Sequence, residues 1–377
     1  IEIQDIMAGE VWVGSGQSNM AMGAGWSAAA PQNDAGMKAL LAAGPYPQVR
    51  HIEFVNDRHW RVAASNRMTA FSGLLLAFGL RLHKELGGPG GLIHSAVSGS
   101  AASCWISEEG LKADPACQAA IKQYASTFNY PVYEAAMKKY DEECKKAEAD
   151  AKAQNKPAPA KPRPPVKPGE GSDGGVGYLY EPCIRPMIPY GIRGVLWDQG
   201  ESGTAVAGVG LYTLMGALIK NWRQDWGEGE FPFIYVQKPS GGGCAWDYTD
   251  LVTTNSDPFA PLPVNSMLDE NGGYEVYSKV RIMGYPNTGM AISSDLGGGL
   301  HPVNKSGYGY RAAGVALGMV YGRPIEYYGP IYDSFKVEGS TIRVSFKHVG
   351  QGLAFRNGEK LQGFAICGED KVWFWAD

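Results

Sequence analysis

A serine in a glycine turn is the first feature of this sequence that could carry out chemistry. Ser18 lies in the segment 14–20 (Gly-Ser-Gly-Gln-Ser-Asn-Met), after an apolar stretch that predicts a β-strand over 10–14. Glycines at such a turn let the backbone approach a substrate, and the Ser18 amide can point at a developing oxyanion. The pattern is typical of a nucleophilic serine; the alternative is a Ser/Gly loop without chemical function.

Two further loops end predicted strands with groups that could donate hydrogen bonds to an oxyanion. The stretch 91–97 predicts a strand followed by Gly99, whose bare amide would suit such a donor. The stretch 194–197 predicts another strand, and a side-chain amide after it could donate in the same way. The polar side chains at that strand end are Asp198, Gln199 and Glu201. Each loop could instead be an ordinary turn.

A histidine on a glycine-rich loop is the fourth candidate. His301 lies in the segment 295–302 (Asp-Leu-Gly-Gly-Gly-Leu-His-Pro), after a predicted strand over 289–293. Ligands of parallel sheets bind beyond the carboxyl ends of the strands, so a histidine there could serve as a general base. An isolated histidine is more often structural.

Strands and helices alternate around these four loops. Such alternation predicts parallel strands joined by helices, hence a three-layer α/β/α sandwich with a central parallel sheet. Besides the strands already named, we expect strands over 49–55 and 231–237, and helices over 34–43, 71–86, 212–226 and 307–321.

Two segments depart from the alternation. Residues 133–154 predict a charged helix, and a proline-rich return follows over 156–175, so we expect an exposed insertion at about 108–178. Its acidic and basic residues balance, which favours a solvated face over a lysine-rich interaction arm. Short strands after Gly329 predict a small β appendage over 330–377. The domain prediction is therefore one large domain over 1–329 that carries the insertion.

Composition excludes several classes of protein. The 377 residues carry 34 Lys and Arg against 38 Asp and Glu, a net charge of −4, which argues against a nucleic-acid partner. No apolar run is long enough to span a membrane. The six cysteines are scattered, which excludes a zinc ribbon and leaves one or two disulfides open. No dinucleotide glycine pattern, phosphate loop or His-Glu-x-x-His motif is present.

Taken together, the four loops resemble a known family. The matching stretches are 9–12 (Gly-Glu-Val-Trp), 15–20 (Ser-Gly-Gln-Ser-Asn-Met), 179–180 (Leu-Tyr) to Pro189, 194–202 (Gly-Val-Leu-Trp-Asp-Gln-Gly-Glu-Ser) and 300–307 (Leu-His-Pro-Val-Asn-Lys-Ser-Gly). In this order they are similar to the SGNH (GDSL-like) serine hydrolases, and within them to the sialate O-acetylesterase-like carbohydrate esterases. The resemblance covers most of residues 9–377.

The resemblance implies a carbohydrate O-acetylesterase that uses a serine nucleophile to hydrolyse acetyl esters of sialates or of plant or marine polysaccharides. Ser18 would be the nucleophile and His301 the general base, with the Ser18 and Gly99 amides and Gln199 around the oxyanion. The further residues expected to support the site or contact the substrate are Gln17, Asn19, Asp198 and Glu201. The expected partner is an acetylated carbohydrate; no metal or other cofactor, nucleic acid or membrane is expected, and the oligomeric state is left open.

One departure from the family pattern concerns the acid that orients the histidine. The family usually has an Asp two or three residues before the His, where this sequence has Gly298 and Gly299. We expect Asp295 to take that role, with Asp198 or Glu201 ranked below it, or else a Ser-His dyad. A non-catalytic or weakly active carbohydrate-binding relative that lost the acid is the alternative function. A nucleotide-binding flavodoxin-like module is disfavoured because the first loop lacks phosphate-cradling spacing.

The resemblance also implies a location outside the cytoplasm. The sequence begins at Ile1 without an initiator Met and shows no signal peptide. We therefore expect a processed or trimmed form of a secreted or periplasmic protein.

Overall fold

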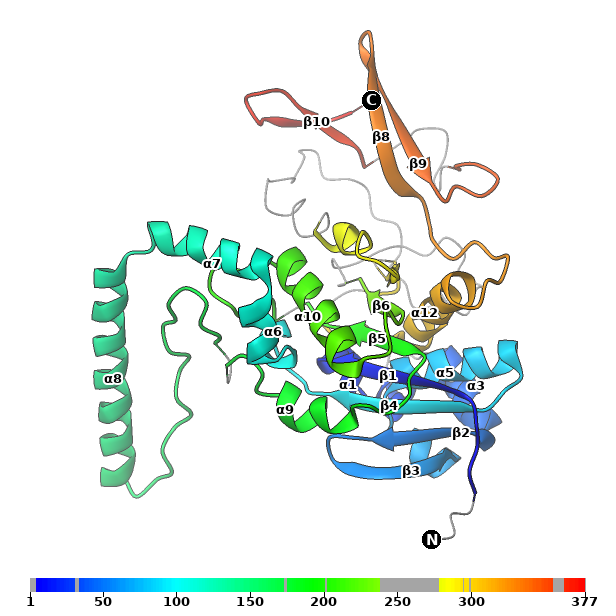
Figure 1. Ribbon diagram of the computed structural model, residues 1–377, viewed down its shortest axis with the longest axis horizontal. Coiled ribbons are helices and arrows are strands. Elements are labelled where there is room, and N and C mark those ends of the chain that lie inside the picture. Colours follow the sequence, from blue (N-terminus) through cyan, green and yellow to red (C-terminus); the bar gives the residue numbers. More distant parts are fainter. Residues whose placement is uncertain are drawn as a thin grey trace. The chain divides into compact units, whose positions relative to one another are not determined.

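The structure of the chain is a computed structural model, shown in Figure 1. It describes residues 5–30, 34–172, 175–200, 202–237, 278–293, 295–297, 300–354 and 363–376. The chain divides into two compact units. The first contains the described residues of Ile1–Ser98, Gly191–Asp198 and Glu230–Asp377, and the second those of Gly99–Tyr190 and Gln199–Gly229.

A mainly parallel sheet of seven strands organises the first unit. Its strands are β1 (Glu10–Gly16), β2 (Tyr46–Glu53), β3 (Asp57–Ala63), β4 (Gly90–Ala96), β5 (Gly194–Asp198), β6 (Phe233–Val236) and β7 (Thr288–Ala291). They are ordered β3-β2-β4-β1-β5-β6-β7, and among neighbouring pairs β2–β3 alone is antiparallel. The predicted α/β fold with a central parallel sheet is confirmed, with β1 in the middle of the sheet.

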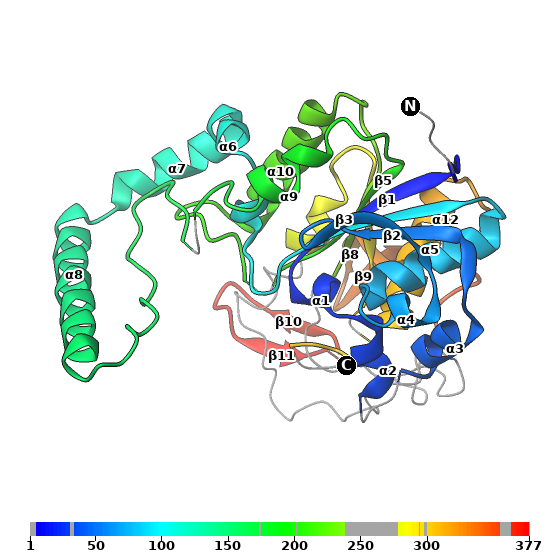
Figure 2. The same cartoon turned by 90° about the horizontal axis from the view of Figure 1, so that it is seen from below.

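Two long helices of the first unit pack together beside this sheet (Figure 2). They are α5 (Gly73–Leu86) and α12 (Lys305–Met319). Gly309 of α12 allows the close approach, because a Cβ atom there would lie 2.5 Å from the carbonyl oxygen of Leu74 in α5. The Ser72 side chain caps the start of α5, and Gly87, with φ 73°, ends it in the left-handed region. The helices of this unit are α1 (Ser18–Ala21), α2 (Ala24–Ala29), α3 (Ala35–Ala43), α4 (Ser65–Met68), α5 (Gly73–Leu86) and α12 (Lys305–Met319).

A buried histidine, His51, lies on β2 beside the core residue Phe71. The His51 ring packs against Phe71 with 4.4 Å between ring centroids. Neither of its ring nitrogens has a hydrogen-bond partner among the described residues. Burial lowers the pKa of His51 to about 4, and the nearby Glu53 carboxylate opposes this only in part.

His51 should make stability depend on pH. Because its folded-state pKa lies below the unfolded value of about 6.5, the unfolded chain binds more protons between those values. Stability should therefore fall as pH decreases from about 6.5 to about 4, by about 3 kcal/mol, and this contribution should level off below that. Urea unfolding of the wild type and of His51→Leu across this range measures the effect. The difference between the two proteins should change with pH; a constant difference would contradict the prediction.

Helices make up most of the second unit. They are η1 (Ala102–Trp105), α6 (Glu108–Ala113), α7 (Pro115–Thr127), α8 (Tyr130–Ala153), α9 (Tyr180–Cys183), η2 (Arg185–Met187) and α10 (Leu211–Trp226). The 24-residue α8 has no buried residue, so it is a solvated helix as its charge pattern predicts. Two contacts hold the proline-rich segment that follows α8 against this helix. The Tyr140 hydroxyl donates to the Pro162 carbonyl at 3.2 Å, and Lys161 forms an ion pair with Glu148 at 2.9 Å.

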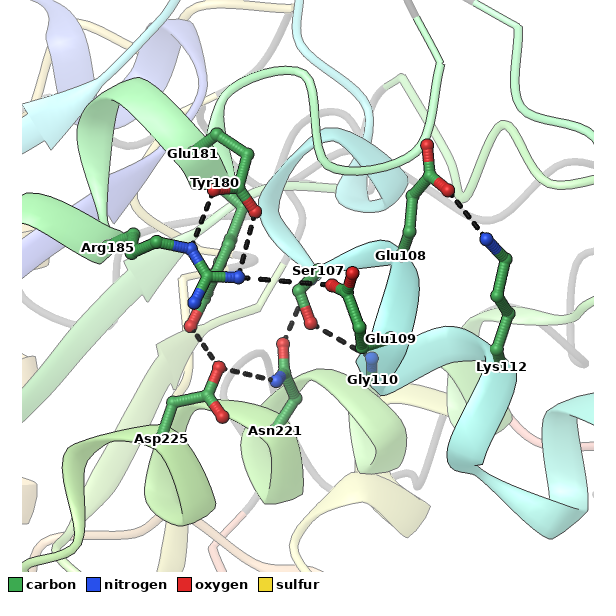
Figure 3. Close-up of polar contacts among 10 residues, drawn as sticks. All are labelled: Ser107, Glu108, Glu109, Gly110, Lys112, Tyr180, Glu181, Arg185, Asn221 and Asp225. Carbon is green, nitrogen blue, oxygen red and sulfur yellow. Dashed lines mark hydrogen bonds and ion pairs between the residues drawn. The ribbon is translucent and has the colours of Figure 1, made fainter.

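A polar cluster joins three helices of the second unit (Figure 3). Asn221 of α10 accepts a hydrogen bond from the Ser107 backbone at 2.9 Å and donates to Asp225 at 3.0 Å. The same Asp225 carboxylate accepts from the Tyr180 hydroxyl of α9. Burial, followed by the hydrogen bond to Asp225, raises the pKa of Tyr180. Because Ser107 is the N-cap of α6, the contacts tie α6, α9 and α10 together.

The C-terminal residues form two antiparallel strand pairs. These are β8 (Ile331–Glu338) with β9 (Thr341–Lys347), and β10 (Ala365–Cys367) with β11 (Trp373–Trp375). The predicted C-terminal β appendage is therefore confirmed. Within the described ranges, no helix is both long and apolar enough to cross a membrane.

Candidate functional site

The turn after β1 places Ser18 at the carboxyl end of the central strand. Gly16 has φ 128°, and a Cβ atom on it would lie 2.0 Å from the Asp198 carbonyl oxygen, so only glycine fits. That same carbonyl accepts the Gln17 backbone N–H at 2.9 Å. Ser18 then begins α1 and is 7% exposed. Its amide is among the first N–H groups of that helix, which have no partner within the helix.

The structure brings Ser18 and His301 together, although they lie far apart in the sequence. The distance between Ser18 Oγ and His301 Nε2 is 2.9 Å. A neutral imidazole can accept the hydroxyl proton at this distance, which is the geometry required of a nucleophile and its general base. Both residues belong to the first unit.

The loop that carries His301 leads into α12. Asn304 caps that helix, since its side chain accepts the Gly307 backbone N–H at 2.8 Å. Asp34, which caps α3, also accepts the Ser306 backbone N–H at 2.9 Å and the Ser306 hydroxyl. The start of α12 is thus fixed from two directions immediately after His301.

Asp295 pairs with an arginine rather than with the histidine. Its two carboxylate oxygens accept from the Arg311 guanidinium of α12, at 2.5 and 2.7 Å. Within the described residues, no carboxylate oxygen lies within hydrogen-bond distance of the His301 ring. The structure therefore does not place Asp295, the residue expected to orient the base, beside the His301 ring. Gly298 and Gly299, between Asp295 and His301, lie outside the described residues.

Asn19 also joins the serine turn to the histidine loop, together with Lys305. Of these two residues, the sequence predicts only Asn19. The Asn19 side-chain amide donates to the Leu300 carbonyl at 3.2 Å. The Asn19 side-chain oxygen accepts from Lys305 Nζ at 2.6 Å. Asn19 was an expected supporting residue, whereas Lys305 was not. The feature of the sequence that could have indicated Lys305 is its position in the segment 300–307, which also contains His301.

Gln17 and Asp198 lie at the ends of neighbouring strands. Both are buried, and Gly16 and Asp198 are paired in the β1–β5 register. Asp198 therefore contacts the serine turn through its backbone carbonyl. This contact helps to fix the conformation of the serine turn. The Asp198 carboxylate is not hydrogen-bonded to His301.

The two other expected oxyanion donors belong to the second unit. The Gln199 side-chain amide donates to the Gly203 carbonyl at 2.8 Å. Gly99, with φ 75°, accepts the Ser202 hydroxyl at its carbonyl at 3.2 Å. The loops after β4 and β5 are therefore joined within that unit. Glu201 lies outside the described residues.

No other reactive centre stands out in the described part of the chain. There, no group of three or more His, Cys, Asp or Glu side chains could hold a metal ion. The described cysteines form no disulfide with one another; they are Cys104, Cys117, Cys144, Cys183 and Cys367. Cys244 lies outside the described residues. The chemistry that the described residues bring together is a buried serine hydroxyl against a histidine base, which suits acyl transfer.

The chain is similar in sequence to proteins named sialate O-acetylesterase. The chain is 26% identical over 364 residues to the mouse sialate O-acetylesterase, covering 88% of this chain and 60% of that protein. It is 25% identical over 398 residues to the human sialate O-acetylesterase, covering 98% of this chain and 65% of that protein. The chain thus spans less than two thirds of each relative. No family model matches it.

A solved structure shares the fold. The crystal structure of a carbohydrate acetylesterase from Xanthomonas citri superposes with a TM-score of 0.66 at 22% sequence identity, covering 97% of this chain and 69% of that one. This likeness shows the same fold. With the relatives above, it confirms the predicted resemblance to sialate O-acetylesterase-like esterases.

Proposed function

We propose that this sialate O-acetylesterase-like chain is a carbohydrate O-acetylesterase with Ser18 as nucleophile and His301 as general base. The observation that carries the proposal is the 2.9 Å contact between Ser18 Oγ and His301 Nε2 at the carboxyl end of β1. The relatives support the choice of acetyl esters of carbohydrates, since they are named for that activity.

The first half-reaction forms an acetyl-enzyme. Ser18 Oγ bonds to the acetyl carbonyl carbon while His301 Nε2 takes the hydroxyl proton, and negative charge collects on the carbonyl oxygen. The Ser18 amide is proposed to stabilise that oxyanion. As the bond between the acetyl carbon and the sugar oxygen breaks, His301 gives the proton to that oxygen, which leaves as a sugar hydroxyl.

Water completes the cycle. His301 Nε2 takes a proton from water as its oxygen attacks the acetyl carbon. The bond from that carbon to Ser18 Oγ then breaks, and the serine is reprotonated. Acetate is released. Gly99 and Gln199 stay predicted oxyanion donors, each expected to supply roughly 3–4 kcal/mol of transition-state stabilisation. Gln17, Asn19, Asp198 and Glu201 stay predicted supporting or substrate-contacting residues.

We further propose that Ser18 and His301 work as a dyad. The pairing of Asp295 with Arg311 supports this reading, because both carboxylate oxygens are already engaged away from His301. The histidine would instead be oriented through the backbone of its loop, which Asn19 holds at Leu300.

Asp295→Asn should therefore have a small effect on kcat. We expect a decrease of less than about ten-fold, whereas removing the acid of a Ser-His-Asp triad costs about 10⁴-fold. The lost pairing with Arg311 should instead lower stability by about 1–2 kcal/mol. Steady-state kinetics and urea unfolding of the same preparation separate the two effects. If a folded variant instead lost a factor of about 10³ or more in kcat, Asp295 would be established as the orienting acid.

A non-catalytic or weakly active carbohydrate-binding relative is the second candidate. The observation that favours it is the same one, namely that no described carboxylate is bonded to His301. Such a protein would bind acetylated sugars without releasing acetate. Turnover therefore distinguishes the two candidates.

Acetate release from a panel of sugars tests the proposed function. The panel consists of an O-acetylated sialic acid, an O-acetylated neutral sugar, and an N-acetylated sugar as the amide control. We expect acetate from one or both esters and none from the amide. Saturable binding of the esters without acetate release would instead establish the binding relative. Which ester is faster identifies the substrate class.

Two broader predictions accompany the function. We propose that residues 1–329 form the hydrolase domain with an insertion at about 108–178, and that 330–377 form the β appendage. The solvated helix α8 supports the insertion, since none of its residues is buried.

The predicted secreted or periplasmic location stays an expectation from the resemblance.

A further inference from the structure

Lys305 is a buried lysine that the proposed reaction does not use. Its exposed fraction is 0%, and it is the first residue of α12. An ammonium group is costly to bury, and the N-terminus of a helix carries partial positive charge that disfavours a cation. Two preferences are thus broken at one residue. Such violations are expected where a residue serves function rather than stability.

The contacts of Lys305 lead to the two reacting side chains. Its Nζ atom donates to Asn19 Oδ1 at 2.6 Å, and Asn19 Nδ2 donates to the Leu300 carbonyl at 3.2 Å. Asn19 directly follows Ser18, and Leu300 directly precedes His301. A continuous path of hydrogen bonds therefore connects the serine turn, the histidine loop and α12.

Lys305 is well placed to select one orientation of the Asn19 amide. The oxygen and nitrogen ends of an asparagine side chain occupy nearly the same space, so the amide can turn over unless its partners differ. Lysine can only donate, which directs Oδ1 toward Nζ and Nδ2 toward the Leu300 carbonyl. Without that donor, Oδ1 would lose this hydrogen bond, and the Asn19 side chain could rotate away from the Leu300 carbonyl and release the histidine loop.

The lysine itself is held firmly. A Cβ atom on Gly73 of α5 would lie 3.3 Å from Lys305 Cβ, so the start of its side chain packs closely on that helix. The next residue, Ser306, is bonded to Asp34. The Lys305 ammonium also lies 5.0 Å from the centre of the Tyr308 ring. These contacts make Lys305 a rigid support for Asn19.

We propose that Lys305 is a positioning residue that acts through Asn19 to hold His301 against Ser18. The proposal rests on the proposed function, and it assigns to a lysine and an asparagine the task that an orienting carboxylate performs in a triad. A displacement of reacting groups by about 1 Å can cost about 10²-fold in rate. Loss of the lysine should therefore lower kcat without changing substrate affinity.

Two substitutions of Lys305 separate the donor from the bulk of the side chain. Lys305→Met has similar reach and no donor, whereas Lys305→Gln keeps an N–H donor. We expect Lys305→Met to lower kcat on p-nitrophenyl acetate by about 10²-fold with KM changed less than two-fold. Lys305→Gln should recover at least a ten-fold part of that loss. If Lys305 had only a structural role, both substitutions would lower the stability of the protein. Neither would then change kcat of the folded enzyme.

Asn19→Asp keeps the test decisive if Lys305→Met does not fold. Asp has nearly the shape of Asn and can still accept from Lys305, but it cannot donate to the Leu300 carbonyl. We expect kcat to fall about 10²-fold in this variant as well. Where both fold, the double variant Lys305→Met/Asn19→Asp should be no slower than the slower single variant, because both break one path.

Tyr321→Phe is the matched control. It breaks a polar network of the same unit at the opposite end of β1, where the Tyr321 hydroxyl accepts from Trp12 and donates to Glu10. We expect it to lower the unfolding temperature and to leave kcat unchanged. The positioning role is overturned if folded Asn19→Asp, or folded Lys305→Met, has a kcat within three-fold of the wild type.

Fluorophosphonate labelling of Ser18 distinguishes this inference from the proposed function. A wild type that is not labelled would overturn both. A wild type that is labelled, together with an Asn19→Asp variant labelled at the same rate, would overturn the positioning role alone. We expect the wild type to be labelled and Asn19→Asp to be labelled about 10²-fold more slowly.

Discussion

Ser18→Ala is expected to lower kcat for acetyl-ester hydrolysis by roughly 10⁴-fold or more, because no acetyl-enzyme can then form. KM should change little, since the serine hydroxyl contributes to the reaction rather than to binding the sugar. The variant should fold normally, as it loses one hydroxyl whose partner, His301, is half-buried and can meet water. Acetate release, measured with saturating ester, gives the decrease directly.

Ser15→Ala is the control for that substitution. Ser15 lies on β1, is 0% exposed, and its hydroxyl has no hydrogen-bond partner among the described residues. Removing an unpaired buried hydroxyl is nearly neutral or stabilising, so kcat and stability should stay at wild-type levels or rise. A Ser18→Ala variant that kept more than a tenth of wild-type activity would rule out Ser18 as the nucleophile.

His301→Gln should lower kcat by a similar factor, roughly 10⁴-fold, because Ser18 then lacks a base. Glutamine preserves some bulk and a hydrogen-bonding end, so folding and KM should be retained. Since Ser18 and His301 act as one unit, the double variant Ser18→Ala/His301→Gln should be no slower than Ser18→Ala alone. Steady-state kinetics of the three variants measure this non-additivity.

His83→Gln is the matched control for the histidine. His83 lies on α5 and its Nδ1 is bonded to the Gly88 carbonyl at 2.8 Å, at the end of that helix. This substitution should leave kcat unchanged. Losses that multiply in the double variant would show that Ser18 and His301 contribute independently, against the proposed mechanism.

The parallel core of the sheet could be predicted from the sequence because its signals are local. The buried strands β1 and β5 are short apolar runs, and α5 has both a serine cap and a glycine stop. By contrast, β3 was not predicted. Its sequence, Asp-Arg-His-Trp-Arg-Val-Ala, is mostly polar, and it forms the half-exposed antiparallel edge of the sheet. Pairing with β2 rather than apolar patterning makes it a strand.

The candidate site could be predicted only in part. Ser18 and His301 stood at strand ends, so topology alone brings them to the same edge of the sheet. The partner of Asp295 could not be predicted, because Arg311 lies 16 residues away on a helix face and sequence spacing does not reveal which group a carboxylate meets. The role of Lys305 could not be predicted, because a lysine that follows a helix cap is usually solvated.

The most direct test of the account is the site at which a fluorophosphonate becomes attached. Peptide mass spectrometry of the labelled wild type should place a single adduct on Ser18. Labelling should be absent in Ser18→Ala and at least about 10²-fold slower in His301→Gln, because the base activates the hydroxyl. An adduct on another residue, or acetate release by a protein that is not labelled at Ser18, would contradict the proposed mechanism.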